Sequence, residues 1–438
     1  MKKHTQSPYE SSKVSYKPSG IEWLGEIPKH WEICKLNKIS YFINGYAFES
    51  SHFDYSFSIP VIRIGDIQND KIIYHTCLMT KEQENLKNFM IYRGDIVIAL
   101  SGATTGKFAV CNSNKKAYIN QRVAIIRSDI KILKYYLSTF GFVNYIDMLC
   151  NGSAQPNIST KEVGNFKIPL PPLQEQKEIA EFLDKKCEKI QNYIDKKQKL
   201  ITLLQEKKQA LINEVVTKGL NPNIEFKNSG IAYLGLIPHH WEIKKLKYVG
   251  KVVLGKMLCN KHQKGYSHCY YLKSKNLQWL NVEVSQIEKM WFSEYEKSLY
   301  RIKKDDLLVS EGGEVGKTCI WNNELAECYI QNSVHKITLN KFNNAKFFLY
   351  LFFTYGKLGV FDSVVSRVSI AHLVLEKLVN VDMVVPPLQE QKQIANFLDE
   401  KCEKINSAIE KTKRQITLIK EYKNTLINEA VCGRIRVN

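Results

Sequence analysis

Two short loops of the chain combine glycine with a following lysine, residue types that together can hold a phosphate group. They read GATTGK, ending at Lys107, and GGEVGKT, which contains Lys317. A nucleotide-binding P-loop has four residues between its glycines, whereas both loops of this chain leave three. The pattern therefore favours a tight turn between two strands, with its lysine facing a phosphate of a bound partner, over a nucleotide cradle.

Other signatures of catalysis are missing from the sequence. It contains no Asn-Pro-Pro-aromatic motif, no glycine-rich cofactor loop between a strand and a helix, and no G-x-S-x-G. Four aspartates near predicted strand ends are interpreted as turn residues rather than nuclease groups; these are Asp66, Asp95, Asp305 and Asp306. His30 and His240 are also interpreted as turn residues, because no acidic or cysteine ligand lies near them. We therefore predict neither a catalytic site nor a metal site.

Composition indicates a globular protein with an anionic partner. The chain has 438 residues, 44% of them hydrophobic, and can form about two to three domains. Its formal net charge of +19 favours nucleic acid as that partner. No apolar run approaches about 18 residues, which argues against a membrane span or secretion. Eleven cysteines without C-x-x-C spacing are typical of reduced thiols, so a cytoplasmic location is expected.

One stretch occurs twice and must organise the fold. Residues 171–190 read PPLQEQKEIAEFLDKKCEKI and residues 386–405 read PPLQEQKQIANFLDEKCEKI, identical at 17 of 20 positions. Each copy opens a segment without Gly or Pro, from Leu173 to Lys218 and from Leu388 to Cys432, and a glycine follows each. Each segment is predicted to form one helix of about 45 residues, starting after the paired prolines and ending at a glycine cap.

Apolar residues recur along both predicted helices at spacings close to the heptad period. The seam consists of Ile179, Leu183, Ile190, Ile194, Ile201, Leu204, Leu211 and Val215 in the first helix, and Ile394, Leu398, Ile405, Ile409, Ile416, Ile419, Leu426 and Ala430 in the second. Polar residues fill the positions between them. A long helix with one narrow apolar stripe needs a matching stripe, and the best partner is the twin helix.

A second repeat precedes each helix. GIEWLGEIPKHWEI at 20–33 matches GIAYLGLIPHHWEI at 230–243 in 10 of 14 positions. Trp31 and Trp241 recur in it beside a proline turn, which favours a shared packing role over base stacking. The chain is thus one unit written twice, a variable domain followed by a long helix.

The two variable domains share the order of their features but little residue identity. The segments IPVIRIGDI at 59–67 and YYLKSKNL at 270–277 each indicate a strand leading to a turn. Residues 94–110 and 305–321 each indicate a strand, a glycine loop and another strand. YINQR at 118–122 corresponds to YIQNS at 329–333, and helical patterns follow at 131–149 and 345–361. The expected class is therefore α+β.

The PPLQEQK-IA-FLD-K helix opening and the GI--LG-IP-HWEI domain entry resemble the DNA specificity subunit of type I restriction-modification systems, over nearly the whole chain. The resemblance implies two target recognition domains, each reading one half of a split DNA sequence, and a fixed spacer of two antiparallel helices. The implied organisation is an N-terminal extension at 1–19, a first recognition domain at 20–170, a spacer helix at 171–218, a linker at 219–229, a second recognition domain at 230–385, a second helix at 386–433 and a tail at 434–438.

The resemblance also implies partners. The helices would dock two methyltransferase subunits, and restriction subunits would complete the nuclease. The specificity chain itself would be a non-catalytic subunit, with S-adenosylmethionine, ATP and magnesium bound by its partners. Because Ile179, Leu183, Ile394 and Leu398 belong to the seam, the contacts with the methyltransferase are expected on the polar residues of the helix openings; these are Gln174, Glu175, Gln389 and Glu390.

DNA-contacting residues are carried over by motif. Lys107 and Lys317 match the family's Gly-Lys turn. An Asn/Gln pair matches at Asn120 and Gln121 and at Gln331 and Asn332; such amides can bond adenine edges, and they can also tie down a loop. Arginine is scarce in this chain and is the commoner reader of guanine, so three arginines are predicted to contact bases, namely Arg63, Arg122 and Arg367. Gln155, in the glycine-containing segment 151–159, and Lys275 complete the predicted set.

Two other classes of function stay open at this point. The chain could be a stand-alone nuclease or methyltransferase with a diverged site, which would act on DNA with added magnesium or S-adenosylmethionine. It could also be a coiled-coil interaction protein without a DNA function. The second alternative leaves the net charge and the paired variable domains unexplained.

Overall fold

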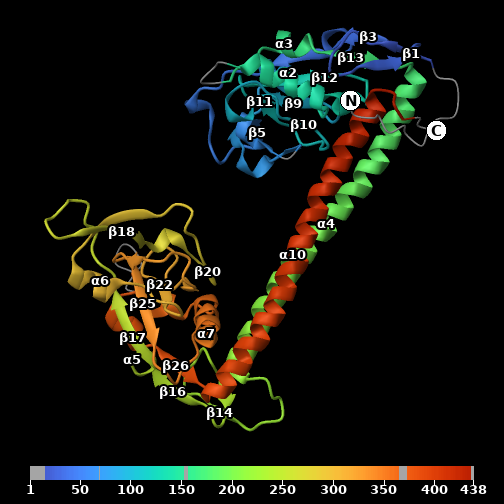
Figure 1. Ribbon diagram of the computed structural model, residues 1–438. Helices are drawn as coiled ribbons and strands as arrows, with labels where there is room; N and C mark the ends of the chain where they lie inside the picture. The colour runs from blue at the N-terminus through green and yellow to red at the C-terminus, as the bar shows by residue number, and fades with distance from the viewer. Residues whose placement is uncertain (1–14, 69, 152–155, 365–371, 436–438) are drawn as a thin grey trace, which may run out of the picture. The chain divides into compact units, whose positions relative to one another are not determined.

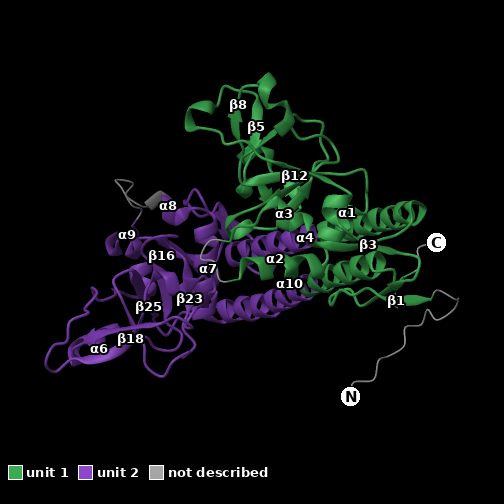
Figure 2. Cartoon of the chain, turned by 90° about the horizontal axis from the view of Figure 1, so that it is seen from above, with its two compact units in different colours: residues 1–197, 414–438 green, residues 198–413 purple. Residues whose placement is uncertain are grey.

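The computed structural model describes residues 15–68, 70–151, 156–364 and 372–435. The chain divides into two compact units, coloured separately in Figure 2. Unit 1 consists of residues 1–197 and 414–438, and unit 2 of residues 198–413. Each unit therefore combines one variable domain with part of both long helices.

The two long helices have nearly the predicted ends. Helix α4 spans Leu173–Lys218 and helix α10 spans Leu388–Val431, each starting directly after the paired prolines. Gly219 and Gly433 follow them with φ of +76° and +70°, the left-handed conformation of a glycine cap. The helical prediction for both segments is confirmed.

Within each unit the two helices run antiparallel. In unit 1 the first part of α4 lies beside the last part of α10, and in unit 2 the last part of α4 lies beside the first part of α10 (Figures 1 and 2). In unit 2 the Lys208 ammonium donates to the Asn406 side-chain oxygen at 2.9 Å across the pair. All sixteen predicted seam residues are buried or half-buried. The antiparallel coiled coil predicted from the seam and the resemblance is confirmed.

The variable domain of unit 1 contains a four-stranded sheet in the order β10-β9-β12-β4 and a three-stranded sheet in the order β11-β5-β8. Strands β1, β3 and β6 pair with β2, β13 and β7 in two-stranded sheets. The strands are β1 (Tyr16–Pro18), β2 (Glu26–Pro28), β3 (Glu32–Lys35), β4 (Tyr41–Asn44), β5 (Ile59–Ile62), β6 (Ile67–Gln68), β7 (Lys71–Ile72), β8 (Leu78–Thr80), β9 (Ile96–Ala99), β10 (Phe108–Val110), β11 (Tyr118–Ile119), β12 (Val123–Arg127) and β13 (Lys167–Leu170).

The helical pattern predicted at 131–149 forms two helices rather than one. Helix α1 spans Leu133–Leu137 and α2 spans Phe140–Cys150, and a short α3, Thr160–Gly164, precedes β13. The break lies at Thr139, whose hydroxyl accepts from the Phe142 N–H at 3.2 Å. This side-chain cap starts a new helix and so ends the preceding one.

Unit 2 repeats this plan with sheets ordered β17-β25-β22-β23 and β21-β18-β24, and with the two-stranded pairs β14-β15, β16-β26 and β19-β20. Its strands are β14 (Phe226–Asn228), β15 (Leu236–Pro238), β16 (Glu242–Lys245), β17 (Gly250–Leu254), β18 (Ser267–Leu272), β19 (Leu277–Gln278), β20 (Asn281–Val282), β21 (Glu288–Phe292), β22 (Leu307–Ser310), β23 (Thr318–Ile320), β24 (Tyr329–Ile330), β25 (Val334–Leu339) and β26 (Asp382–Val385). Its helices within the domain are α5 (Leu246–Val249), α6 (Glu294–Tyr300), α7 (Ala345–Lys357), α8 (Val360–Val364) and α9 (Leu375–Val379). The α+β class is confirmed.

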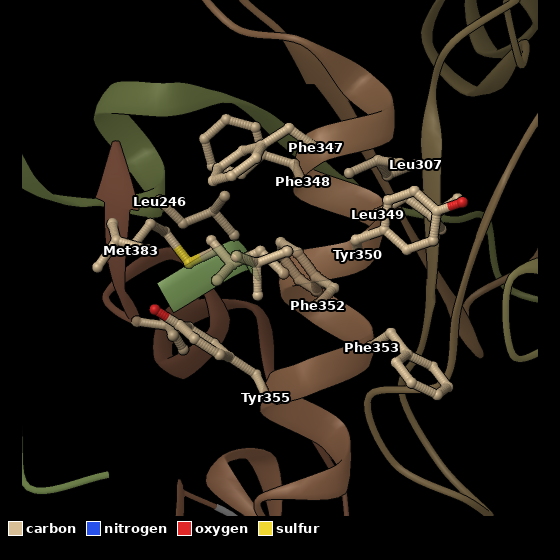
Figure 3. Close-up of a cluster of buried hydrophobic side chains, with 14 of the residues drawn as sticks. Leu246, Leu307, Phe347, Phe348, Leu349, Tyr350, Phe352, Phe353, Tyr355 and Met383 are labelled. Carbon is tan, nitrogen blue, oxygen red and sulfur yellow. The ribbon is translucent and has the colours of Figure 1, made fainter. Parts of the chain in front are cut away.

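Helix α7 forms the centre of the unit 2 core. Its run from Phe347 to Tyr355 is buried, and Figure 3 shows its aromatic rings beside Leu246, Leu307 and Met383. The same cluster includes Val215 of α4 and Leu398 of α10. Burial of each large apolar side chain contributes about 1.5–3 kcal/mol, so this cluster holds both long helices against the domain.

The repeat begins earlier than the sequence match indicated. Strand β1 pairs with β2, and β14 pairs with β15 in the same register, Tyr16 opposite Pro28 and Phe226 opposite Pro238. Short strands therefore lie within both the predicted N-terminal extension and the predicted linker. No helix among the described residues is long and apolar enough to cross a membrane.

Candidate nucleic-acid interface

Four segments of unit 1 that contain or adjoin predicted DNA-contacting residues lie together, and we call them the first edge. The Leu100 N–H donates to the Arg122 carbonyl at 2.9 Å, and the Gly102 N–H donates to the Pro156 carbonyl at 2.9 Å. Ile64 packs against Gly102, where an added Cβ would lie 3.3 Å from its Cδ1. The first edge thus consists of residues 63–66, 101–107, 120–122 and 156–158.

The equivalent segments of unit 2 also lie together and form the second edge. The Ser274 N–H donates to the Ser333 hydroxyl at 3.0 Å, and the Glu311 N–H donates to the Ser333 carbonyl at 2.9 Å. The Leu373 N–H donates to the Glu311 carbonyl at 2.8 Å. The second edge consists of residues 273–276, 311–317, 331–333 and 372–373.

The glycine loops are hairpin turns at these edges. Strand β9 pairs antiparallel with β10, and β22 with β23, so each Gly-Lys loop joins two neighbouring strands and no helix follows it. A P-loop requires a helix whose N-terminus receives the phosphate. The interpretation of both loops as turns is confirmed.

On the first edge most predicted side chains are free. Gln121, Arg122 and Lys107 are exposed and Asn120 is half-buried, and within the described part of the chain no hydrogen bond or ion pair engages these four side chains. Arg63 differs, because its guanidinium lies 3.3 Å from the Asp66 carboxylate and donates to the Thr76 carbonyl at 2.8 Å. Arg63 therefore has a structural role in its turn, and any base contact would have to compete with these bonds.

On the second edge the predicted side chains are engaged with their neighbours. Gln331 donates to the Asn332 side chain and accepts from the Ser333 hydroxyl at 2.5 Å, so these amides tie down their own turn. The Lys275 ammonium lies 3.0 Å from Glu288, and the Lys317 ammonium lies 3.0 Å from Glu314. The second edge therefore presents paired charges where the first presents a free lysine. Gln155 and Arg367, which were also predicted to contact DNA, lie outside the described residues.

The sequence analysis missed two carboxylates that pair with lysines of the second edge, namely Glu288 on β21 and Glu314 within the edge itself. A third missed residue, Lys256, is 10% exposed and forms an ion pair with Glu296 at 2.5 Å. The Lys256 carbonyl accepts from the Asn332 N–H at 2.8 Å, so this partly buried pair supports the amide turn. The sequence offered a weak signal for it, because Lys256 follows Gly255 at the place where Tyr46 follows Gly45 in the first domain.

The polar residues at the helix openings contact their own domains. The Glu175 carboxylate accepts from Trp31 Nε1 at 2.8 Å and lies 2.7 Å from His30 Nε2. Glu390 lies 2.8 Å from His240 Nε2 in the same way. Gln389 is exposed, and Gln174, also exposed, donates to Glu178 at 2.8 Å on the same helix. Part of the identity between the two helix openings is therefore explained by docking of each helix onto its own domain.

Two further motif residues have the same docking role. Asp184 accepts from Tyr135 at 2.5 Å, and Asp399 accepts from Tyr350 at 2.8 Å. Trp31 and Trp241 are 2% and 0% exposed, which confirms their packing role.

Comparison with known proteins identifies the family of this chain. A family model described as the type I restriction modification DNA specificity domain matches twice, at residues 28–204 and 238–418. The chain belongs to this family. Both specificity domains thus include one edge and most of one long helix.

Curated relatives support the assignment, one over nearly the full length and another over part of it. The putative type I restriction enzyme MjaX specificity subunit of Methanocaldococcus jannaschii is 26% identical over 430 residues, which cover 94% of this chain and 96% of that protein. The EcoAI specificity subunit of Escherichia coli is 32% identical over 182 residues, covering 38% of this chain and 30% of that protein.

Solved structures show the same fold. A chain from a structure on the complex assembly and conformational transition of the type I R-M system has a TM-score of 0.70 and 16% identity, covering 93% of this chain and 99% of that one. The HsdS subunit from Thermoanaerobacter tengcongensis has a TM-score of 0.50 and 17% identity, covering 93% and 98%.

Three of the four aspartates that could suggest nuclease chemistry in these specificity domains have structural partners, and the fourth, Asp305, lies in a turn with φ of +69°. Asp95 pairs with Arg127 at 2.7 Å, and Asp66 accepts from the Thr76 hydroxyl at 2.7 Å. Asp306 accepts from the Lys303 N–H at 2.8 Å. Among the described residues no group of three or more His, Cys, Asp or Glu is arranged to hold a metal ion.

Proposed function

We propose that each edge reads one half of a bipartite sequence in double-stranded DNA, and that the chain is the specificity subunit of a type I restriction-modification complex. The observation that carries the proposal is the same four-segment edge, built twice from different residues on one backbone plan. Equivalent backbones with different side chains suit two half-sites of different sequence.

The electrostatics of the chain support DNA as the partner. The formal net charge is +19, and both edges carry lysines within glycine turns. Phosphate contacts by such lysines release counterions, so the affinity of the chain for duplex DNA should fall steeply with salt. The family and the names of its members favour this non-catalytic role over the two alternatives, an enzyme or a coiled-coil interaction protein.

Methylation mapping tests the proposal. The chain is expressed with a type I methyltransferase subunit from the same source, and host DNA is sequenced by a method that detects methylated bases. A bipartite methylated motif that disappears when the chain is omitted is the expected result. If the purified chain alone cleaves or methylates DNA with added magnesium or S-adenosylmethionine, the enzyme alternative replaces the proposal.

The partners follow from the same proposal. Two methyltransferase subunits would dock at the two helix openings, on Gln174, Glu175, Gln389, Glu390 and the exposed face beyond them, and restriction subunits would join in the cytoplasm. S-adenosylmethionine, ATP and magnesium would be bound by those subunits.

A charge test of docking should use the glutamines, because Glu175 and Glu390 hold their own domains. Gln174→Arg with Gln389→Arg should abolish assembly with the methyltransferase in size-exclusion chromatography and leave DNA binding intact. Glu178→Ala, which removes the hydrogen-bond acceptor of Gln174 without adding a positive charge, is the matched control.

The long helices would set the gap between half-sites. Deleting one heptad at equivalent positions of α4 and α10 should shorten the gap in the methylated motif and leave both half-site sequences unchanged. A changed half-site sequence would contradict this division of labour.

A further inference from the structure

Glu288 gathers three side chains at the second edge. Its carboxylate lies 2.6 Å from the Lys273 ammonium and 3.0 Å from the Lys275 ammonium, and it accepts from the Tyr271 hydroxyl at 2.9 Å. The Lys273 bond lowers the pKa of Glu288 most, followed by those of Lys275 and Tyr271, to about 2. This carboxylate is therefore ionised throughout the physiological range, and it holds both lysines of the 273–276 segment.

Glu314 has the same relation to the glycine turn. It lies 3.0 Å from the Lys317 ammonium, whose side chain is only 16% exposed, and it accepts from Trp279 Nε1. Burial acts to raise the pKa of Glu314, but the bonds from Trp279 and Lys317 outweigh it, and the pKa is lowered. Lys317, which was predicted to contact a phosphate, is thus held by an ionised carboxylate, and the hydrogen bond from Trp279 fixes that carboxylate in place.

Neither carboxylate has a counterpart on the first edge. Glu288 lies opposite Tyr271 in its sheet, where Leu78 lies opposite Val61 in unit 1. Thr104 precedes the Gly106-Lys107 turn at the place where Glu314 precedes its own. The first edge therefore lacks a surface acid at both positions.

These ion pairs change what a DNA backbone would encounter. A phosphate approaching Lys273, Lys275 or Lys317 must displace a carboxylate already in contact and lies near its negative charge. Exposed ion pairs are individually weak, so a phosphate can displace them, and each displacement lowers the gain from the contact. Contacts with the DNA backbone do not distinguish one sequence from another. When these contacts contribute little free energy, the affinity of the second edge depends mainly on its base contacts.

We propose that Glu288 and Glu314 are specificity-determining residues that restrain the lysines of the second edge and suppress its binding to non-target DNA. The inference rests on the proposed DNA-binding function. It makes the second edge the more discriminating half of the protein, and the first edge the half that supplies sequence-independent affinity.

The test uses the full chain and a duplex of random sequence. Binding constants are measured from about 50 to about 200 mM salt for the wild type, Glu288→Gln and Glu314→Gln. Each released lysine should steepen the log–log salt slope by about 0.9, which means about 1.8 for Glu288→Gln and about 0.9 for Glu314→Gln. Affinity at the lower salt concentration should rise in both variants.

Two controls separate the release of lysines from a general gain of positive charge. Glu242→Gln breaks an exposed pair with Lys244 on β16, away from the edge, and should leave the slope unchanged. Adding Lys273→Ala and Lys275→Ala to Glu288→Gln should return the slope to that of the wild type. Unchanged slopes in both edge variants, or an equal gain in Glu242→Gln, would overturn the inference.

The wild-type measurement separates a failure of the restraint by Glu288 and Glu314 from a failure of the proposed DNA-binding function. If the wild-type chain binds duplex DNA with a steep salt dependence and the edge variants behave like it, only the restraint is wrong. If neither the wild-type chain nor its complex with the methyltransferase binds DNA at any salt concentration, the proposed function fails and the restraint fails with it.

Discussion

The first and second edges share a backbone plan and differ in how their side chains are satisfied. On the first edge the side chains of Asn120 and Gln121 have no hydrogen-bond partner among the described residues, whereas on the second the Gln331 side chain bonds both Asn332 and Ser333. Lys107 is likewise free and Lys317 is paired with Glu314. The same motif position is thus available for a ligand in one domain and occupied by the protein in the other. Motif equivalence alone does not establish equivalent contact.

Trp31 and Trp241 should give the largest effects, because both are fully buried where a domain meets a helix. Either Trp→Ala change should cost about 3–5 kcal/mol in the unit that contains it. Trp→Phe should cost different amounts of stability at the two positions, since Trp31 donates to Glu175 while Trp241 Nε1 is buried without a partner. We expect Trp31→Phe to cost about 1–3 kcal/mol more than Trp241→Phe, measured by hydrogen exchange in each unit. Equal costs would show that the Trp31 hydrogen bond contributes little.

A substitution of Arg122 tests whether the unpaired side chains of the first edge contact DNA bases. Arg122→Ala should lose about 1–3 kcal/mol of discrimination at one base position of one half-site, read as a relaxed motif in methylation mapping. Ser333 occupies the corresponding place on the second edge and bonds Gln331, so Ser333→Ala should act through loosening of its turn. Relaxation of both half-sites by Arg122→Ala alone would break the assignment of one edge to one half-site.

His335 should make the stability of unit 2 depend on pH. Burial lowers the pKa of His335 from 6.5, an effect partly offset by its bond to the Leu373 carbonyl at 2.7 Å. The unfolded chain therefore binds more protons just below pH 6.5, and unit 2 should lose up to about 1.4 kcal/mol per pH unit as the pH falls through that range.

Unit 1 has Ala124 at the corresponding place in its sheet and should lack this dependence on pH. His335→Gln should remove it from unit 2, as followed by urea unfolding at several pH values. Burial raises the pKa of Glu311, which acts in the opposite direction, so a loss of stability on acidification that persists in His335→Gln would have to come from other groups.

The smallest effect is expected at the glycine turns. Lys107→Ala should reduce the log–log salt slope for duplex DNA by about 0.9, because Lys107 is free to contact a phosphate. Lys317→Ala should reduce it by less, because Glu314 already neutralises that lysine. Equal reductions would mean that the Glu314 pair opens without cost when DNA binds.

Much of the architecture was predictable from local pattern. The ends of α4 and α10 follow from paired prolines, an uninterrupted helical stretch and a glycine cap, all of which act within one turn. The hairpin turns at Lys107 and Lys317 follow from glycine spacing. The break at Thr139 was missed because a single hydroxyl cap outweighed a continuous apolar pattern.

The contents of the candidate site were only partly predictable. The segments that form each edge were identified from the order of features and from resemblance, and their convergence agrees with that order. Glu288 and Glu314 were missed, because an acid between ordinary residues carries no signal until strand register places it beside a lysine. The docking role of Glu175 was missed for the same reason, since His30 and Trp31 are far from it in sequence.

By itself the sequence determined that this protein is one unit written twice, with two long helices, two α+β domains and an excess of positive charge, because repeats, helix ends and composition are local properties of a chain. Only the tertiary structure decided which of the equivalent side chains remain free. Ion pairs and amide networks form between segments distant in sequence, so the same motif becomes an open surface around Lys107 and a restrained one around Lys317.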